Sequence, residues 1–245
     1  MLTDLSEIRK KEKELETLHE TKDRLFAIIG HDLRKPALAF RGISKKVNYL
    51  IKQNQLERLY KFGGHIEKMA FAMNNLLDNV LNWALQQRAM LPYNPVIVNI
   101  KENIDDSFQL FRQIADDKGV TLTLDIDENY TIFFDSNAFN TIIRNLLDNA
   151  IKYTPLGGTV SLSADRQEGG ILLKIADTGI GMEQDTINDI FLLKKNKSIV
   201  GTNGEEGNGL GLILVRDLIA LNKGTIKVIS RWNGGTTFEI FLPAG

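Results

Sequence analysis

The first part of the chain carries apolar residues at heptad spacing within a strongly charged background. They follow one heptad frame in residues 4–15 and a second frame, offset by three positions, in residues 18–29. The seam consists of Leu5, Ile8, Leu15, Leu18, Leu25 and Ile29. Such an offset is a stammer, which locally overwinds a coiled coil. Since Glu12 and Lys22 occupy the remaining seam positions, we expect a short, weak coil.

A second helix is predicted over about residues 55–90, where apolar residues alternate at spacings of three and four. This stripe consists of Ile66, Met69, Met73, Leu76, Val80 and Trp83. Two long helices joined by a turn form a hairpin, and a lone hairpin cannot cover both of its apolar stripes. We therefore expect two copies of the chain to pair into a dimeric four-helix bundle.

Beyond residue 90 the pattern changes to alternating strands and helices. Pro92 and Pro95 cannot donate backbone hydrogen bonds, so residues 91–95 are predicted to be a linker. Strands are expected near residues 96–100, 120–125, 131–134, 158–163, 170–176, 224–230 and 236–242. Helices are expected near residues 101–117, 136–152, 183–190 and 209–222. The chain is thus predicted to be multidomain, with a helical hairpin over residues 1–90 and an α/β sandwich over residues 96–245.

Composition excludes classes of function more than it identifies one. The 245-residue chain is 43% hydrophobic and 25% charged, as ordinary globular proteins are. A formal net charge of −1 gives no general basic surface, so we expect no nucleic-acid partner. The absence of cysteine excludes disulfides and thiolate metal sites. No apolar run approaches the ~18 residues of a membrane span, so we expect no membrane contact from this chain itself. We expect a cytoplasmic chain, or the cytosolic portion of a membrane-anchored receptor.

The first chemical motif is "NTIIRNLLDNAIKYT", on the helix predicted over residues 136–152. Asn145 and Asn149 lie four positions apart, with Lys152 three further on, so the three side chains share one helix face. A solvated polar stripe is the simple alternative. Asparagine is a poor residue for a helix interior, however, and its amide oxygen is a ligand suited to Mg²⁺. A lysine beside it could neutralise phosphate.

The second motif is "DTGIGM", directly after the strand expected at residues 170–176. Asp177 stands at the strand's end, and Gly179 and Gly181 follow in the turn. A carboxylate there can accept a hydrogen bond from an exocyclic amine such as that of adenine. Glycines let the backbone approach a flat ring. An ordinary Asp-Thr-Gly turn is the alternative.

The third motif is "GEEGNGLGLILV", which ends a long irregular segment at residues 192–208 and leads into an apolar helix. Its glycines include Gly207, Gly209 and Gly211. Glycine-rich backbone that leads into a helix N-terminus favours anions such as phosphate. The spacing fits neither of the two common nucleotide-binding glycine motifs. A flexible linker is the alternative, although a linker would not lead directly into a helix.

Taken in this order, the three motifs resemble the ATP-binding domain of sensor histidine kinases, which belongs to the gyrase/Hsp90/MutL-type ATPase superfamily. The resemblance runs from about residue 96 to "GGTTFEIFLP" at 234–242. The stretch "FAIIGHDLRKPALAF" and the helix after it resemble the dimerisation and phosphoacceptor domain of the same kinases.

The resemblance implies a role for each site residue. Asn149 would ligate Mg²⁺, Asn145 would support the metal–phosphate site and Lys152 would contact phosphate. Asp177 would bind the adenine amine. Residues around the base and the phosphates would be Tyr153, Gly179, Gly181, Gly207, Gly209, Leu210 and Gly211.

His31 matches the phosphorylated histidine of the family. Asp32 beside it can hydrogen-bond the imidazole, fix its tautomer and take up the released proton. A neutral imidazole is a competent nucleophile near neutral pH. One position departs from the pattern. Family members that dephosphorylate their partner commonly carry a small polar residue four positions after the histidine, where this chain has Lys35. A lysine donates but does not accept hydrogen bonds, so we expect weak phosphatase activity by this route.

The resemblance implies a homodimeric kinase that autophosphorylates His31 from ATP and Mg²⁺. The phosphoryl group would then pass to an aspartate in the receiver domain of a response regulator. Two alternatives belong to other classes: a catalytically silent ATP-binding scaffold, and an ATP-driven clamp of the chaperone or topoisomerase type. Retention of His31, Asp32, Asn149 and Asp177 argues against the scaffold, and the phosphoacceptor helix argues against the clamp.

Overall fold

The computed structural model describes residues 40–87, 93–192, 201–203 and 211–244, with residues 9, 12, 30 and 38 in addition. The chain divides into two compact units, Met1–Ala89 and Met90–Gly245. Most of the predicted coiled coil lies outside the described residues, as do His31, Asp32 and Lys35. No helix in the described ranges is long and apolar enough to cross a membrane.

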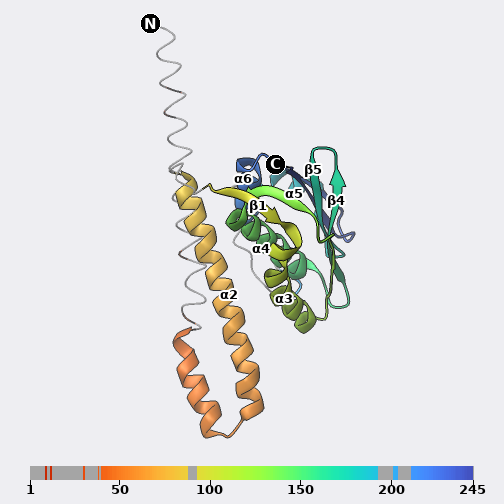
Figure 1. Ribbon diagram of the computed structural model, residues 1–245. Helices are drawn as coiled ribbons and strands as arrows, with labels where there is room; N and C mark the ends of the chain where they lie inside the picture. The colour runs from red at the N-terminus through yellow and green to blue at the C-terminus, as the bar shows by residue number, and fades with distance from the viewer. Residues whose placement is uncertain are drawn as a thin grey trace. The chain divides into compact units, whose positions relative to one another are not determined.

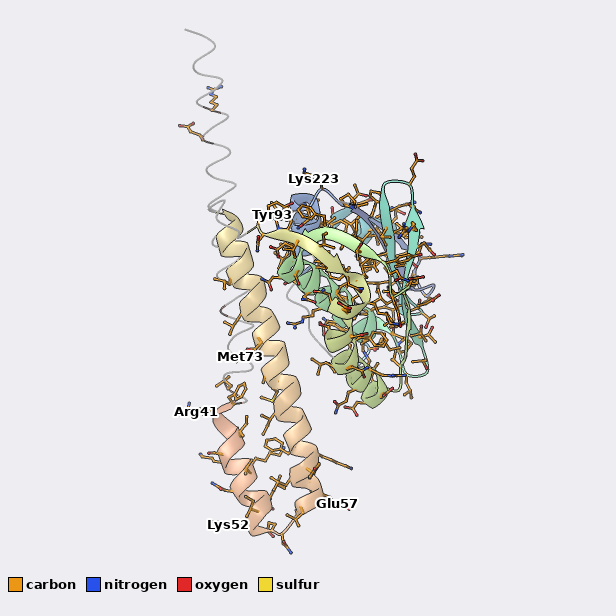
Figure 2. All side chains as sticks on the ribbon, in the orientation of Figure 1. Arg41, Lys52, Glu57, Met73, Tyr93 and Lys223 are labelled. Carbon is orange, nitrogen blue, oxygen red and sulfur yellow. The ribbon has the colours of Figure 1, made fainter. Side chains whose placement is uncertain are left out.

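In the described part of the first unit, two helices are joined by a tight turn. Residues 40–52 are helical, and α2 spans Leu56–Gln87, close to the second helix that the sequence predicts. Asn54, with φ of 51°, ends the first helix in the left-handed region, and the Gln55 N–H bonds the Leu50 carbonyl at 3.0 Å. Figure 2 labels Lys52 and Glu57 on either side of this turn. The Nζ of Lys46 lies 4.8 Å from the ring centroid of Phe62, and this contact links the two helices. The dimeric bundle stays a prediction.

The second unit alternates strands and helices as the sequence predicts. Its strands are β1 (Pro95–Asn99), β2 (Thr121–Asp125), β3 (Thr131–Asp135), β4 (Thr159–Gln167), β5 (Gly170–Asp177), β6 (Thr225–Ser230) and β7 (Thr236–Pro243). Its helices are α3 (Ile100–Lys118), α4 (Ser136–Tyr153), α5 (Gln184–Asp189) and α6 (Gly211–Leu221). The predicted α/β sandwich is confirmed.

The main sheet has five strands in the order β2-β4-β5-β7-β6, and β1 pairs with β3 in a separate two-stranded sheet. Strands β2 and β4 are parallel, and the other neighbours are antiparallel. One face of the main sheet is apolar and lies under α3, α4 and α6 (Figure 1). Its fully buried side chains include Val160, Leu162, Leu173, Ile175 and Ile240. These residues occupy alternate positions along their strands, which is why one face packs against helices.

The β4–β5 hairpin is longer than the sequence predicts. Strand β4 continues to Gln167, which pairs with Gly170 across a two-residue turn. Its last residues are exposed and polar, so they lack the apolar alternation that marks a strand. Gly169, with φ of 80°, supplies the left-handed conformation that such a short turn requires.

Helix α4 is fixed at its first turn by buried polar side chains. Asp135 caps the helix, because its Oδ1 accepts a 2.9 Å hydrogen bond from the Ala138 N–H. The Asp135 N–H in turn donates to Oδ1 of Asn222, which follows α6, at 3.0 Å. Both side chains are more than 90% buried, so this contact joins the start of α4 to the end of α6 within the core.

Candidate nucleotide site

Asp177 is the last residue of β5, the central strand of the main sheet, and its side chain is mostly buried. Its Oδ1 accepts hydrogen bonds from the backbone N–H of Gly179 at 2.8 Å and of Thr236 at 3.2 Å. Oδ2 accepts none from the residues that the structure describes. Burial raises the pKa of this carboxyl to about 6, although the two N–H donors act in the opposite direction. Oδ2 of Asp177 is therefore a fixed acceptor that a hydrogen-bond donor of a ligand can reach.

Glycines are required around Asp177 because other backbone segments approach closely. A Cβ on Gly179 would lie 2.5 Å from the Tyr153 carbonyl and 2.7 Å from Asp177 Oδ1. Gly181, with φ of 64°, leaves room for the Arg231 carbonyl, and Gly235 leaves room for that of Asp177 itself. Thus the "DTGIGM" turn needs its glycines for packing as well as for any ligand.

The predicted polar face of α4 is present. Asn145 and Asn149 are both partly exposed on the helix, and Asn145 Nδ2 donates to the Thr141 carbonyl at 2.8 Å. The Asn149 amide makes no hydrogen bond within the described part of the chain. Lys152 is only 7% exposed, and its Nζ lies 4.9 Å from the ring centroid of Tyr153. A buried ammonium beside an aromatic face is a cation–π arrangement.

Two connections bring the three motifs together. The Ile180 N–H donates to the Tyr153 carbonyl at 3.1 Å, so the turn after β5 lies against the end of α4. Gly211 begins α6, and a Cβ there would collide with Oδ1 of Asn145. The N-terminus of α6 therefore lies beside the asparagine face of α4. The other residues predicted for this motif, Gly207, Gly209 and Leu210, lie outside the described residues.

Sequence reasoning missed three contributors. Thr236 supplies the second N–H to Asp177 through its backbone, which no side-chain pattern could indicate. Thr202 donates through Oγ1 to the carbonyls of Lys152 at 3.2 Å and Thr154 at 3.0 Å. Lys118, the last residue of α3, donates to two carbonyls at the end of α4. A lysine just before Gly119 indicates the C-terminus of a helix, but it does not indicate that this lysine bonds the carbonyls of α4.

The donor set at this site fits a magnesium ion held mainly by phosphate and water. Among the described residues, no group of three or more histidine, cysteine, aspartate or glutamate side chains can hold a metal. The amide of Asn149, which has no hydrogen-bond partner among the described residues, could offer a single oxygen ligand on the face that also carries Lys152. Mg²⁺ typically binds in this way, with few protein ligands and the phosphates of its substrate.

Comparison with known proteins agrees with this geometry. A model of the histidine kinase-, DNA gyrase B- and HSP90-like ATPase family matches residues 134–245. The solved structure of the mycobacterial sensor histidine kinase MprB is 26% identical, with a TM-score of 0.53, and the likeness covers 61% of this chain and 97% of that one. The second unit is an ATP-binding domain of the sensor histidine kinase type. The family predicted from the motifs is confirmed.

Two curated relatives extend the likeness beyond the ATP-binding domain. The autoinducer 2 sensor kinase/phosphatase LuxQ of Vibrio harveyi is 27% identical over 243 residues, which cover 94% of this chain. Sensor protein SrrB of Staphylococcus aureus is 27% identical over 228 residues, or 92% of this chain. The chain spans 27% and 39% of the lengths of these relatives, so each contains further sequence outside the match.

Proposed function

We propose that this chain is the kinase portion of a two-component sensor. It binds ATP and Mg²⁺ in the second unit and autophosphorylates His31. It then transfers the phosphoryl group to an aspartate in the receiver domain of a response regulator. The main support is the Asp177 site, where a mostly buried carboxylate has one oxygen, Oδ2, with no hydrogen-bond partner among the described residues, in a domain of this ATPase family. The sensor kinase relatives support the same assignment for the rest of the chain.

The adenine end of the site uses Asp177 and its neighbours. The exocyclic amine of adenine would donate a hydrogen bond to Oδ2, the oxygen that has no partner among the described residues. Gly179 and Gly181 would shape the base pocket, and the ring of Tyr153 would lie against the base or the ribose. Because Oδ1 is held by two backbone N–H groups, the acceptor is fixed before nucleotide binds.

The phosphate end uses α4 and the start of α6. Asn149 would hold Mg²⁺ through its amide oxygen, supported by Asn145, and Lys152 would contact phosphate. A bound Mg²⁺ would neutralise charge on the phosphate oxygens. The N-terminus of α6 with its preceding residues, namely Gly207, Gly209, Leu210 and Gly211, would offer backbone N–H groups to the same anion.

Phosphoryl transfer is proposed to occur at an imidazole nitrogen of His31. The nitrogen lone pair forms a bond to the γ-phosphorus while the bond from phosphorus to the bridging oxygen of ADP breaks. Asp32 hydrogen-bonds the ring and takes the proton that the imidazole loses. The transfer depends on the alignment of the imidazole with the γ-phosphate more than on covalent chemistry from the protein.

Labelling with γ-³²P-ATP and Mg²⁺ tests this proposal. We expect label that is stable to base and labile to acid, and that is lost in His31→Ala. The matched controls are His19→Ala and His65→Ala, the two other histidines of the chain, which should keep the label. Nucleotide binding with no label would favour the silent scaffold instead. Steady ATP turnover with no label would favour the clamp.

The organisation of the protein is part of the same proposal. Residues 1–90 would form the coiled coil and phosphoacceptor hairpin, residues 91–95 the linker and residues 96–245 the catalytic domain. The hairpin would pair with that of a second copy, and the whole would lie in the cytosol. Light scattering at several concentrations measures the expected dimer, and a monomer at all concentrations would contradict it.

A further inference from the structure

The carbonyl end of α4 is a junction of three segments. The last carbonyls of a helix have no partners within the helix and must be satisfied from elsewhere. Here the Tyr153 carbonyl accepts from Ile180 N–H at 3.1 Å, and the Thr154 carbonyl accepts from Thr202 Oγ1 at 3.0 Å. The Lys152 carbonyl accepts from both the N–H and Oγ1 of Thr202, at 3.1 and 3.2 Å. Lys152, the residue expected to contact phosphate, is thus fixed through hydrogen bonds to its own backbone carbonyl.

Lys118 completes this junction from α3. Its Nζ donates to the Ile151 carbonyl at 2.9 Å and to the Lys152 carbonyl at 2.7 Å, and the side chain is half-buried. It is also the last residue of α3, before Gly119 ends that helix with φ of 70°. The residue that ends α3 therefore donates to the carbonyl end of α4. A cation there offsets the partial negative charge of that helix terminus.

We propose that Lys118 is a positioning residue of the nucleotide site and acts through Lys152. This inference rests on the proposed function, because it assumes that Lys152 contacts phosphate. Lys118 does not touch the nucleotide. It fixes the peptide that carries the Lys152 side chain, so that the ammonium of Lys152 stays in place on the face shared with Asn149.

The physical reason is that Lys152 projects from the last turn of its helix, where helices normally fray. Without the ammonium of Lys118, two adjacent carbonyls at the end of α4 lose a charge-assisted hydrogen bond. The terminal turn then loosens, and the phosphate contact loses its alignment. Asp177, which would bind the base, belongs to β5 and is held by Gly179 and Thr236 instead. Loss of Lys118 should therefore affect the phosphate end more than the adenine end.

The test compares the binding of ADP with Mg²⁺ and the binding of adenosine, measured by calorimetry on the full chain well below its melting temperature. In Lys118→Met we expect ADP affinity to fall about tenfold and adenosine affinity to change less than about twofold. Lys118→Arg, which keeps the charge and can donate to two carbonyls, should recover most of the loss. Lys174→Met is the matched control, since Lys174 is ion-paired with Asp165 at the surface and should change neither affinity.

A double-mutant cycle with Lys152→Met separates positioning from general destabilisation. If Lys118 acts through Lys152, the Lys118→Met change should cost less than about twofold in ADP affinity once Lys152 is absent. Equal losses for ADP and adenosine, no loss at all, or a tenfold loss that persists in Lys152→Met would each overturn the inference. If Lys118→Met does not fold, Lys118→Gln provides the same comparison. Unaltered protein that binds no adenine nucleotide would refute the proposed function itself.

Discussion

At the scale of single residues, Asp177 combines two opposing influences. Two backbone N–H donors favour its ionised form, and burial favours its neutral form. Burial is the larger effect, so the pKa is raised to about 6 from the ordinary 3.8. The folded protein thus holds a carboxylate whose ionisation costs stability. Such a group is expected where a ligand compensates for the cost.

Asp177→Asn should stabilise the ligand-free protein near neutral pH and weaken its binding of ADP. The folded pKa lies above the unfolded one, so stability from the bound proton is present below about pH 4 and is lost as the pH rises through about 6. Above about pH 6, the ionised Asp177 therefore lowers the free energy of unfolding by roughly 3 kcal/mol relative to acid pH. Denaturant unfolding of both proteins at acid and neutral pH measures it.

The matched control for this experiment is Asp165→Asn, because Asp165 is an exposed carboxylate paired with Lys174. This change should leave the difference between acid and neutral pH almost unaltered. An Asp177→Asn variant that is no more stable than the unaltered protein at neutral pH would contradict burial as the cause of the shifted pKa.

The affinity for adenine nucleotide should also depend on pH through Asp177. As the pH falls through about 6, the carboxyl takes up a proton and becomes a weaker acceptor for the adenine amine. We expect ADP affinity to decline over this range and adenosine affinity to decline in parallel, since both carry the base. In Asp177→Asn both profiles should be flat, and a persistent decline there would assign the titration to another group.

At the scale of elements, the site depends on close contacts between the turn after β5 and its neighbours. Gly181 and Gly235 each face a backbone carbonyl, of Arg231 and Asp177 respectively. Both glycines also have positive φ. A side chain at either position is therefore disfavoured by the backbone conformation and by the lack of space. The sequence indicates the first restriction through its glycines. The second depends on β6 and β7, which follow much later in the chain.

Gly181→Ala should therefore destabilise the second unit more than Gly157→Ala does. Both glycines have positive φ, of 64° and 82°, so alanine costs about 1–2 kcal/mol at either position from backbone conformation alone. Only Gly181 also has a carbonyl where the Cβ would stand, whereas nothing lies within 4 Å at Gly157. Thermal unfolding of the two variants measures the difference, and equal losses would show that the contact relaxes freely.

Element order and the polar face of α4 were predictable because each depends on local spacing. Alternation marks β5, and the interval from Asn145 to Asn149 marks one helix face. The roles of Thr202 and Thr236 were not predictable, since they act on carbonyl or carboxylate groups 48 and 59 positions away in sequence. Such contacts depend on tertiary packing. The exposed, polar end of β4 was missed for the opposite reason, because its own pattern is weak.

At the scale of the whole molecule, the proposed kinase separates its acceptor from its ATP site. His31 and Lys35 belong to the first unit, and Asn149 and Asp177 belong to the second. Because each unit has its own compact fold, a change in one should leave the local chemistry of the other intact. In His31→Ala we therefore expect unaltered ADP affinity.

Lys35→Thr should increase dephosphorylation of a phosphorylated receiver domain. Threonine accepts as well as donates a hydrogen bond, so it can orient a water molecule that lysine cannot. The rate is measured as loss of label from a purified, phosphorylated receiver domain after the protein is added. Lys45→Thr is the control, because Lys45 is an exposed residue of the helix at 40–52. Rapid dephosphorylation by the unaltered protein that disappears in Lys35→Ala would refute the expectation.

The backbone donors that fix Asp177 have a consequence for inhibition. An inhibitor that donates to Oδ2 of Asp177 would contact a carboxylate held by the N–H groups of Gly179 and Thr236. Among single substitutions only one to proline removes a backbone donor, and a Cβ on Gly179, Gly181 or Gly235 meets neighbouring atoms. If Asp177 binds adenine as proposed, changes to Asp177 itself would weaken the binding of ATP as well. Few single substitutions should therefore confer resistance to such a compound while the kinase stays active.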